Sequence, residues 1–96
     1  MVGNDEEKMA EQTLTLLHVL AAEPPENGTI RTRSTVRTGA PKVGDRYWFE
    51  DADRKRRSLK VESIQPSPRW WTIVFSGPYD DLCRIVTGTY IRGQAS

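Results

Sequence analysis

The sequence predicts a mainly β fold: a small, partly open barrel of four to five antiparallel strands preceded by an α-helix. All eight aromatic residues of the chain lie between Tyr47 and Tyr90, so the core must be built in that stretch. Within it, short runs of β-branched and aromatic residues alternate with turns rich in glycine, proline and aspartate, which is typical of antiparallel sheets. A chain of 96 residues has room for one domain with one modest core.

The residues before this core divide into two parts. Residues 1–8 are polar, and we expect them to be disordered. Residues 9–23 are expected to form an amphipathic helix, because apolar residues recur there at helical spacing and Pro24-Pro25 would end the helix. A strand is the alternative, since the segment 13–16 alternates between threonine and leucine. The apolar stripe of the helix consists of Ala10, Leu14, Leu17 and Ala21, with Leu20 beside it.

Residues 24–40 connect the helix to the barrel. The segment from Thr29 to Thr38 is rich in β-branched residues, which favours a strand, but its only apolar members are Ile30 and Val36. Two interpretations follow: an edge strand with most of its side chains in water, or an extended basic linker.

The barrel itself is assigned to residues 41–96. Pro66 and Pro68 predict a turn, because proline is not tolerated in a central strand. The apolar residues of the strand before this turn break strict alternation, which predicts a β-bulge near Glu62-Ser63. Bulges and glycine bends among several short strands are typical of an SH3-like barrel. The expected strands cover residues 46–50, 58–64, 69–76 and 82–87, with a short closing strand or turn at 89–91.

Two segments of the barrel resemble small SH3-like barrels of the KOW and Tudor kind. They are Val43-Gly44-Asp45-x-Tyr47, in which a Gly-Asp turn leads into the first strand, and Leu59-Lys60-Val61-Glu62-Ser63-Ile64, which follows a loop. The resemblance covers roughly residues 41–92, although the loop 51–57 lacks the glycine of the KOW pattern. It implies a binding domain, because KOW-like domains often bind RNA or other proteins and Tudor-like domains often hold methylated side chains in aromatic cages.

The net charge of +1 hides two halves of opposite sign. Residues 1–28 hold six acidic residues and one lysine, whereas residues 29–96 hold thirteen basic and seven acidic residues. Such halves either attract each other or meet different partners. The chain as a whole is nevertheless less basic than a dedicated DNA-binding domain.

No set of residues in the sequence spells out an enzyme. His18 is the only histidine and lies in the predicted helix, far in sequence from the only cysteine, Cys83. Nucleophilic catalysis by a Cys-His pair needs contact between the two side chains, which nothing in the sequence predicts. We therefore expect a protein that is not an enzyme, with no cofactor and no small-molecule substrate.

Metal binding and membrane insertion are not expected either. The acidic pairs at 51/53 and 80/81 lack the spacing of a calcium loop, and Asp53 is followed by four cations. The apolar stretch 14–22 is too short to span a bilayer, and acidic rather than basic residues precede it. With one thiol and no secretion signal, the chain is expected in the cytoplasm.

The leading functional hypothesis is a non-enzymatic adaptor, a small regulatory or accessory protein of a bacterium or phage. Its partner would be another protein or a second copy of the chain, bound through the helix and an outward aromatic surface. Trp70 and Trp71 are adjacent in a strand and must face opposite sides, so one of them is left outside the core. The expected protein-interface residues are Leu14, Leu17, Leu20, Trp48 and Trp70.

The alternative hypothesis is a nucleic-acid-binding module. A basic hairpin loop beside an exposed tryptophan would contact phosphates while the ring stacks on a base. Arg31, Arg33 and Arg37 would extend this track if their segment ran along the same edge. The same charges also suit a solvated loop that protects a sheet edge and pairs with nearby carboxylates. The residues expected to contact DNA or RNA are Arg54, Lys55, Arg56, Arg57, Lys60, Arg69 and Trp70.

Overall fold

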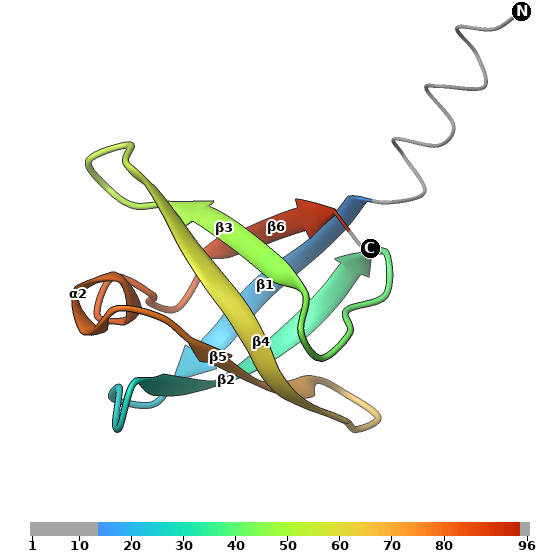
Figure 1. The fold of residues 1–96 in the computed structure, drawn as a ribbon. Coiled ribbons are helices and arrows are strands. Elements are labelled where there is room, and N and C mark those ends of the chain that lie inside the picture. Colours follow the sequence, from blue (N-terminus) through green and yellow to red (C-terminus); the bar gives the residue numbers. More distant parts are fainter. Residues whose placement is uncertain (1–13, 95–96) are drawn as a thin grey trace, which may run out of the picture.

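Antiparallel strands wrap into a closed barrel in the computed structural model, which describes residues 14–94 of the chain (Figure 1). The strands are β1 (Leu14–Ala22), β2 (Thr29–Thr38), β3 (Arg46–Glu50), β4 (Arg56–Pro66), β5 (Trp71–Ser76) and β6 (Tyr90–Gln94). Around the barrel they follow the order β1-β2-β5-β4-β3-β6, and β6 pairs with β1 to close it. The predicted mainly β class is confirmed, but the described residues form a closed barrel of six strands rather than a partly open one of four to five.

Alternate residues of the strands fill the interior, because successive side chains of a strand point to opposite faces of the sheet. Tyr47 and Phe49 of β3 lie fully inside, as the distribution of aromatic residues predicts, and Trp71 is half-buried against the core. The other buried apolar side chains of this core are Leu17, Val19, Ile30, Leu59, Val61, Ile73, Phe75, Leu82, Ile85 and Ile91.

The helix predicted for residues 9–23 is wrong over its described part, because Leu14–Ala22 is strand β1. It pairs with β2 on one side and with β6 on the other, so its backbone groups have partners along both edges. Thr15, Leu17 and Val19 alternate into the barrel, which is the period of a strand. A helix of this length is marginal alone, whereas the strand completes the barrel. Residues 9–13, and the disorder expected for 1–8, lie outside the described residues.

Residues Thr29–Thr38 form strand β2, which is neither a linker nor an edge. It lies between β1 and β5 and is hydrogen-bonded to both. Its inward positions include Thr32 and Ser34, whose hydroxyl groups lie 2.9 Å apart, and the Thr32 hydroxyl donates to the carbonyl of Ile73 at 3.0 Å. These buried hydroxyl groups satisfy each other, which explains how a strand with so few apolar residues belongs to the interior of the sheet.

The Gly-Asp turn before β3 is built as its sequence predicts. Gly44 adopts a positive φ of 93°, a conformation that suits glycine. The Asp45 carboxylate accepts hydrogen bonds from the backbone N–H of Lys42 at 3.0 Å and from the hydroxyl of Tyr47 at 2.8 Å. Burial, followed by this hydrogen bond to Asp45, raises the pKa of Tyr47 to about 12. The predicted strand at 46–50 is confirmed.

Strand β4 carries the predicted bulge, which appears as a register shift between Val61 and Ser63 opposite β5. It begins earlier than expected, because Arg56 and Arg57 pair in register with Glu50 and Phe49. Two of the seven residues of the predicted loop 51–57 therefore belong to strand β4.

The strand predicted at residues 82–87 is wrong. Tyr79–Leu82 forms a short helical turn, α2, and an irregular connection leads from it to β6 (Figure 1). Leu82 and Ile85 are both buried in the core, and their spacing of three residues suits a helical turn rather than a strand. No helix within residues 14–94 is long and apolar enough to cross a membrane.

Candidate functional site

The outer side of β3 and its two neighbours carries a cluster of basic side chains around one tryptophan. Because Tyr47 and Phe49 point inward, Arg46 and Trp48 point outward. The register places Trp48 between Ser58 of β4 and Arg92 of β6. We call this surface the β3 face; it consists of Arg46, Trp48, Arg56, Lys60 and Arg92, drawn from three adjacent strands.

Trp48 holds two of these arginines by cation–π contact. The guanidinium carbon of Arg56 lies 3.8 Å from the centre of the Trp48 ring, and that of Arg92 lies 5.4 Å from it. Such contacts contribute about 0.5–1 kcal/mol each at exposed sites. The half-buried ring therefore orients the guanidinium groups, whose N–H donors remain available for a ligand.

The cations of the β3 face have no carboxylate partner among residues 14–94. Every ion pair in that part of the chain involves Arg57. Glu50 pairs in register with Arg56, yet the two side chains do not form an ion pair. Arg46 lies directly opposite Lys60, and like charges in opposed positions of a sheet destabilise it. The face thus carries four cations and one opposed carboxylate, that of Glu50, and its net charge is positive.

Arg57 does not belong to this surface, contrary to its place in the predicted nucleic-acid set. Its Nε donates to Asp51 at 2.8 Å, and one terminal nitrogen donates to Asp81 at 2.7 Å and to Asp80 at 3.2 Å. The side chains of Arg57 and Asp51 are only 13% and 2% exposed. These bonds tie the β3–β4 loop to α2 and occupy the Nε and one terminal nitrogen of a side chain that is mostly buried.

Two pKa shifts follow from this cluster. The hydrogen bond to Asp81, followed by that to Asp51, raises the pKa of Arg57. The backbone N–H of Lys55, and after it the Arg57 guanidinium, holds the pKa of Asp51 below its usual value. Both groups therefore remain charged across the ordinary pH range, which suits a structural ion pair.

The predicted juxtaposition of the basic loop with Trp70 is also wrong. Arg56 stands at the start of β4, whereas Trp70 lies beyond the far end of β4, just before Trp71, which pairs with Pro66. Ten residues of strand separate the two ends by about 33 Å. Arg54 and Lys55 are exposed at the loop and Arg69 is exposed in the turn before Trp70. Trp70 instead lies under Arg33 of β2, at 5.0 Å.

The residues predicted to form a protein interface do not lie on one surface, because some point into the barrel and others point outward. Leu17 is fully buried in the core and is wrong as an interface residue, because β1 turns it inward. Leu20, on the other side of β1, is 39% exposed. The side chain of Leu14 lies outside the described residues, and Trp48 and Trp70 are half-buried beneath arginines.

Sequence reasoning missed Arg46 and Arg92. Arg46 lies two residues before Trp48 in a strand that was correctly predicted, so the two side chains point to the same side of the sheet. The outward position of Arg46 could therefore have been predicted from the sequence. Arg92 reaches Trp48 only because β6 pairs with β3, which no local pattern indicates.

The ring of His18 in β1 stacks on the ring of Tyr90 in β6, with 4.5 Å between the ring centres. His18 is thus engaged by a tyrosine, and Cys83 is exposed beside α2.

No group of three or more His, Cys, Asp or Glu side chains within residues 14–94 has an arrangement that could hold a metal ion. The chain matches no protein-family model, no curated protein and no solved structure. The β3 face is therefore interpreted from its own chemistry alone.

Proposed function

We propose that this protein is a nucleic-acid-binding module and that its β3 face contacts the phosphate backbone. One observation carries the proposal: four cations gather around Trp48 without a carboxylate partner in the described chain, and two of them, Arg46 and Lys60, oppose each other directly. A polyanion would relieve this repulsion and release its own counterions on binding.

The chemistry of the face suits phosphates better than bases. A guanidinium group offers planar N–H donors that match phosphate oxygens, and stacking on Trp48 holds that of Arg56 in place. The guanidinium carbon of Arg56 lies 3.8 Å from the centre of the Trp48 ring, so this side of the ring is not open for a base to stack on. Phosphate contacts position a nucleic acid without reading its sequence. The proposed binding is accordingly independent of sequence.

Two further features support this proposal. The Val43–Tyr47 turn resembles that of KOW-like domains, which often bind RNA. The single thiol, Cys83, is exposed, which fits a reducing cytoplasm where a small bacterial or phage accessory protein would meet nucleic acid.

The test is a titration of the full chain with fluorescently labelled single- and double-stranded oligonucleotides at several salt concentrations. Four phosphate contacts predict a slope of log K against log salt of about −3 for single strands. Arg92→Gln removes one contact and should reduce the magnitude of that slope by about 0.7. Arg84→Gln is the matched control, because Arg84 is exposed on the connection after α2, forms no ion pair within residues 14–94 and has no contact with the Trp48 ring.

The tryptophan fluorescence of the chain gives an independent signal in the same titration. A phosphate bound to Arg56 or Arg92 changes the charge above the Trp48 ring and should change its contribution to the emission. Absence of binding at low salt to both kinds of oligonucleotide would refute the proposal, as would an affinity that salt does not change.

A protein partner is the second candidate, because apolar side chains are exposed beside β1. Leu20 is 39% and Tyr90 is 45% exposed. The Val19 N–H donates to the carbonyl of Thr89 and the Gly88 N–H donates to the carbonyl of Val19, which brings the exposed Val86 turn toward them. An association through these side chains would survive moderate salt. Sedimentation of the full chain at low and moderate salt separates the candidates, since a salt-resistant dimer would favour the adaptor.

A further inference from the structure

We infer that the barrel carries a second phosphate-binding face, on the side opposite the β3 face, so that one chain bridges two segments of nucleic acid. The ligand class rests on the proposed function; the existence and position of the second face rest on independent observations. The face is formed by Arg31 and Arg33 of β2 together with Trp70, which comes just before β5.

The order of the strands places the two faces back to back. In the ring β1-β2-β5-β4-β3-β6, strand β2 is three places from β3 in either direction. In a closed barrel this is the opposite wall (Figure 1). Outward side chains of β2 and β3 therefore point away from each other. The basic residues of β2 therefore do not extend the β3 face, as a continuous track would require, but form a surface of their own.

This second face repeats the local chemistry of the first. Ile30 and Thr32 of β2 are buried, so the intervening Arg31 and the following Arg33 point outward. The guanidinium carbon of Arg33 lies 5.0 Å from the centre of the Trp70 ring, as Arg56 and Arg92 lie over Trp48.

A tight turn holds Trp70 in position. The backbone N–H of Ser67 donates to the Trp70 carbonyl at 2.9 Å, and the Ser67 hydroxyl donates to the same oxygen at 2.6 Å. The ring that supports Arg33 is thus attached to a fixed point of the backbone.

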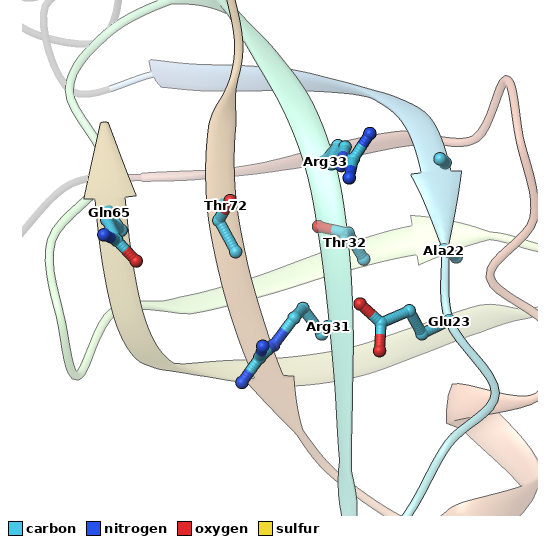
Figure 2. A pocket seen from close by; sticks show the side chains of 8 residues that line it. Ala22, Glu23, Arg31, Thr32, Arg33, Gln65 and Thr72 are labelled. Atoms are coloured by element: carbon cyan, nitrogen blue, oxygen red, sulfur yellow. The ribbon is translucent and has the colours of Figure 1, made fainter. Parts of the chain in front are cut away.

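An open hollow of about 300 Å³ lies beside these arginines, as Figure 2 shows. Gln65 and Thr72 border it on one side of Arg31, and Glu23 borders it on the other. The amide of Gln65 and the hydroxyl of Thr72 can donate hydrogen bonds to phosphate oxygens. Within residues 14–94 neither arginine forms an ion pair with Glu23, so the hollow is lined by two cations and one carboxylate. A second carboxylate, that of Glu26, lines the adjoining hollow together with Glu23 and Arg31.

The two faces can be occupied together. Opposite walls of a sheet structure are about 10 Å apart, and the arginine side chains extend outward from each wall. Strands bound on the two faces are then separated by more than the Debye length of about 8 Å at physiological ionic strength, which screens their repulsion. With two cations rather than four, the second face should bind more weakly and with a smaller salt slope.

The experiment measures energy transfer between two oligothymidylates, one carrying a donor dye and the other an acceptor, in the presence of the full chain. These strands cannot pair with each other, so transfer requires a protein that holds both. We expect transfer when oligonucleotide exceeds protein, and its loss in excess protein, when each strand occupies a separate chain. The double variant Arg31→Gln/Arg33→Gln should abolish transfer and keep binding of one strand through the β3 face.

Two controls make the result specific. Lys42→Gln/Arg84→Gln removes two exposed cations outside both faces and should keep the transfer. A thermal melt of each variant verifies that the barrel is folded, as expected for substitutions of exposed side chains. Binding with one strand per chain and no transfer at any ratio would overturn the second face and leave the proposed function standing. Transfer that persists in Arg31→Gln/Arg33→Gln would also overturn it, because the bridge would then lie elsewhere. If the unsubstituted chain binds neither oligothymidylate nor a duplex, the proposed function itself fails; if it binds duplexes alone, donor- and acceptor-labelled duplexes take the place of the single strands.

Discussion

Arg46 lies directly opposite Lys60 in the register of β3 and β4, on the outer side of the barrel. Side chains in such positions have Cβ atoms about 5 Å apart, so the two cations repel each other in the folded state. A barrel that needed only stability would gain from a carboxylate at either position. The pair therefore connects the stability of the barrel to the binding proposed for its surface.

Lys60→Glu should stabilise the protein and weaken its binding. The new carboxylate would face Arg46 across the strands, and opposite charges in this arrangement contribute about 0.2–1 kcal/mol. The same change places a negative charge in the β3 face, so affinity for oligonucleotides should fall. Urea unfolding and an oligonucleotide titration measure the two effects, with Lys55→Glu in the exposed loop as the control. If Lys60→Glu lost stability and kept full affinity, repulsion between Arg46 and Lys60 would not destabilise the sheet and Lys60 would not take part in binding.

Gly93→Ala should strongly destabilise the barrel. Gly93 of β6 is paired with Tyr47 of β3, and a Cβ added at Gly93 would overlap the Tyr47 ring and lie 2.9 Å from the carbonyl oxygen of Arg46. Tyr47 is buried and hydrogen-bonded to Asp45, so the ring has no room to move aside. Overpacking of this kind costs about 3 kcal/mol. Denaturant unfolding of the variant measures the loss.

Gly77→Ala is the matched control for this substitution. A Cβ at Gly77 would lie 3.4 Å from the carbonyl oxygen of Ser58 and 3.6 Å from a methyl group of Leu59, which is close to ordinary contact. Its free energy of unfolding should change by about 1 kcal/mol or less, because the unfolded chain also loses freedom. Equal effects at both glycines would mean that the Tyr47 ring does not fill the space at Gly93.

The buried Tyr47 hydroxyl predicts a loss of stability at high pH. Burial raises the folded-state pKa of Tyr47 to about 12, against an ordinary value near 10. Because the folded state holds the proton more tightly, this contribution is complete below pH 10 and is lost as the pH rises from about 10 to 12. A shift of this size corresponds to about 2–3 kcal/mol.

Tyr47→Phe isolates this contribution from other groups that titrate in the same range. At neutral pH the variant should be less stable by about 1–2 kcal/mol, because the Asp45 carboxylate loses a hydrogen bond. The difference between the two proteins should shrink as the pH rises toward 12, as followed by denaturant unfolding at each pH. A constant difference would contradict the buried hydrogen bond.

The aromatic barrel wall could be predicted because its signals are local. Strand β3, the turn at Asp45 and the bulge at Glu62-Ser63 each depend on residues close together in the sequence. The polar strand β2 could not be assigned to the barrel in this way. Its inward Thr32 and Ser34 are acceptable only because they bond to each other and to a carbonyl of β5, a distant partner.

The candidate site was predicted only in part for the same reason. Arg56 and Trp48 are close in sequence and both were named, but Arg92 joins them through the closure of the barrel. Arg57 was assigned to the basic surface because its carboxylate partners in α2 come from a distant segment. The density of charge in a sequence does not indicate which cations the fold neutralises.

Strand β1 is the clearest failure, and two substitutions in it test the structural explanation. Its leucines satisfy helical spacing and strand alternation together, so the pattern alone does not decide. In the strand, Leu17 is fully buried and Leu20 is 39% exposed, whereas both belonged to one apolar surface of the predicted helix. Leu17→Ala should therefore cost about 2–5 kcal/mol of unfolding free energy. Leu20→Ala should cost far less, because its side chain already meets water. Denaturant unfolding of both variants tests this explanation. Similar losses of unfolding free energy would favour the helix over the strand, and a negligible loss for Leu17→Ala would show that Leu17 is not part of the core.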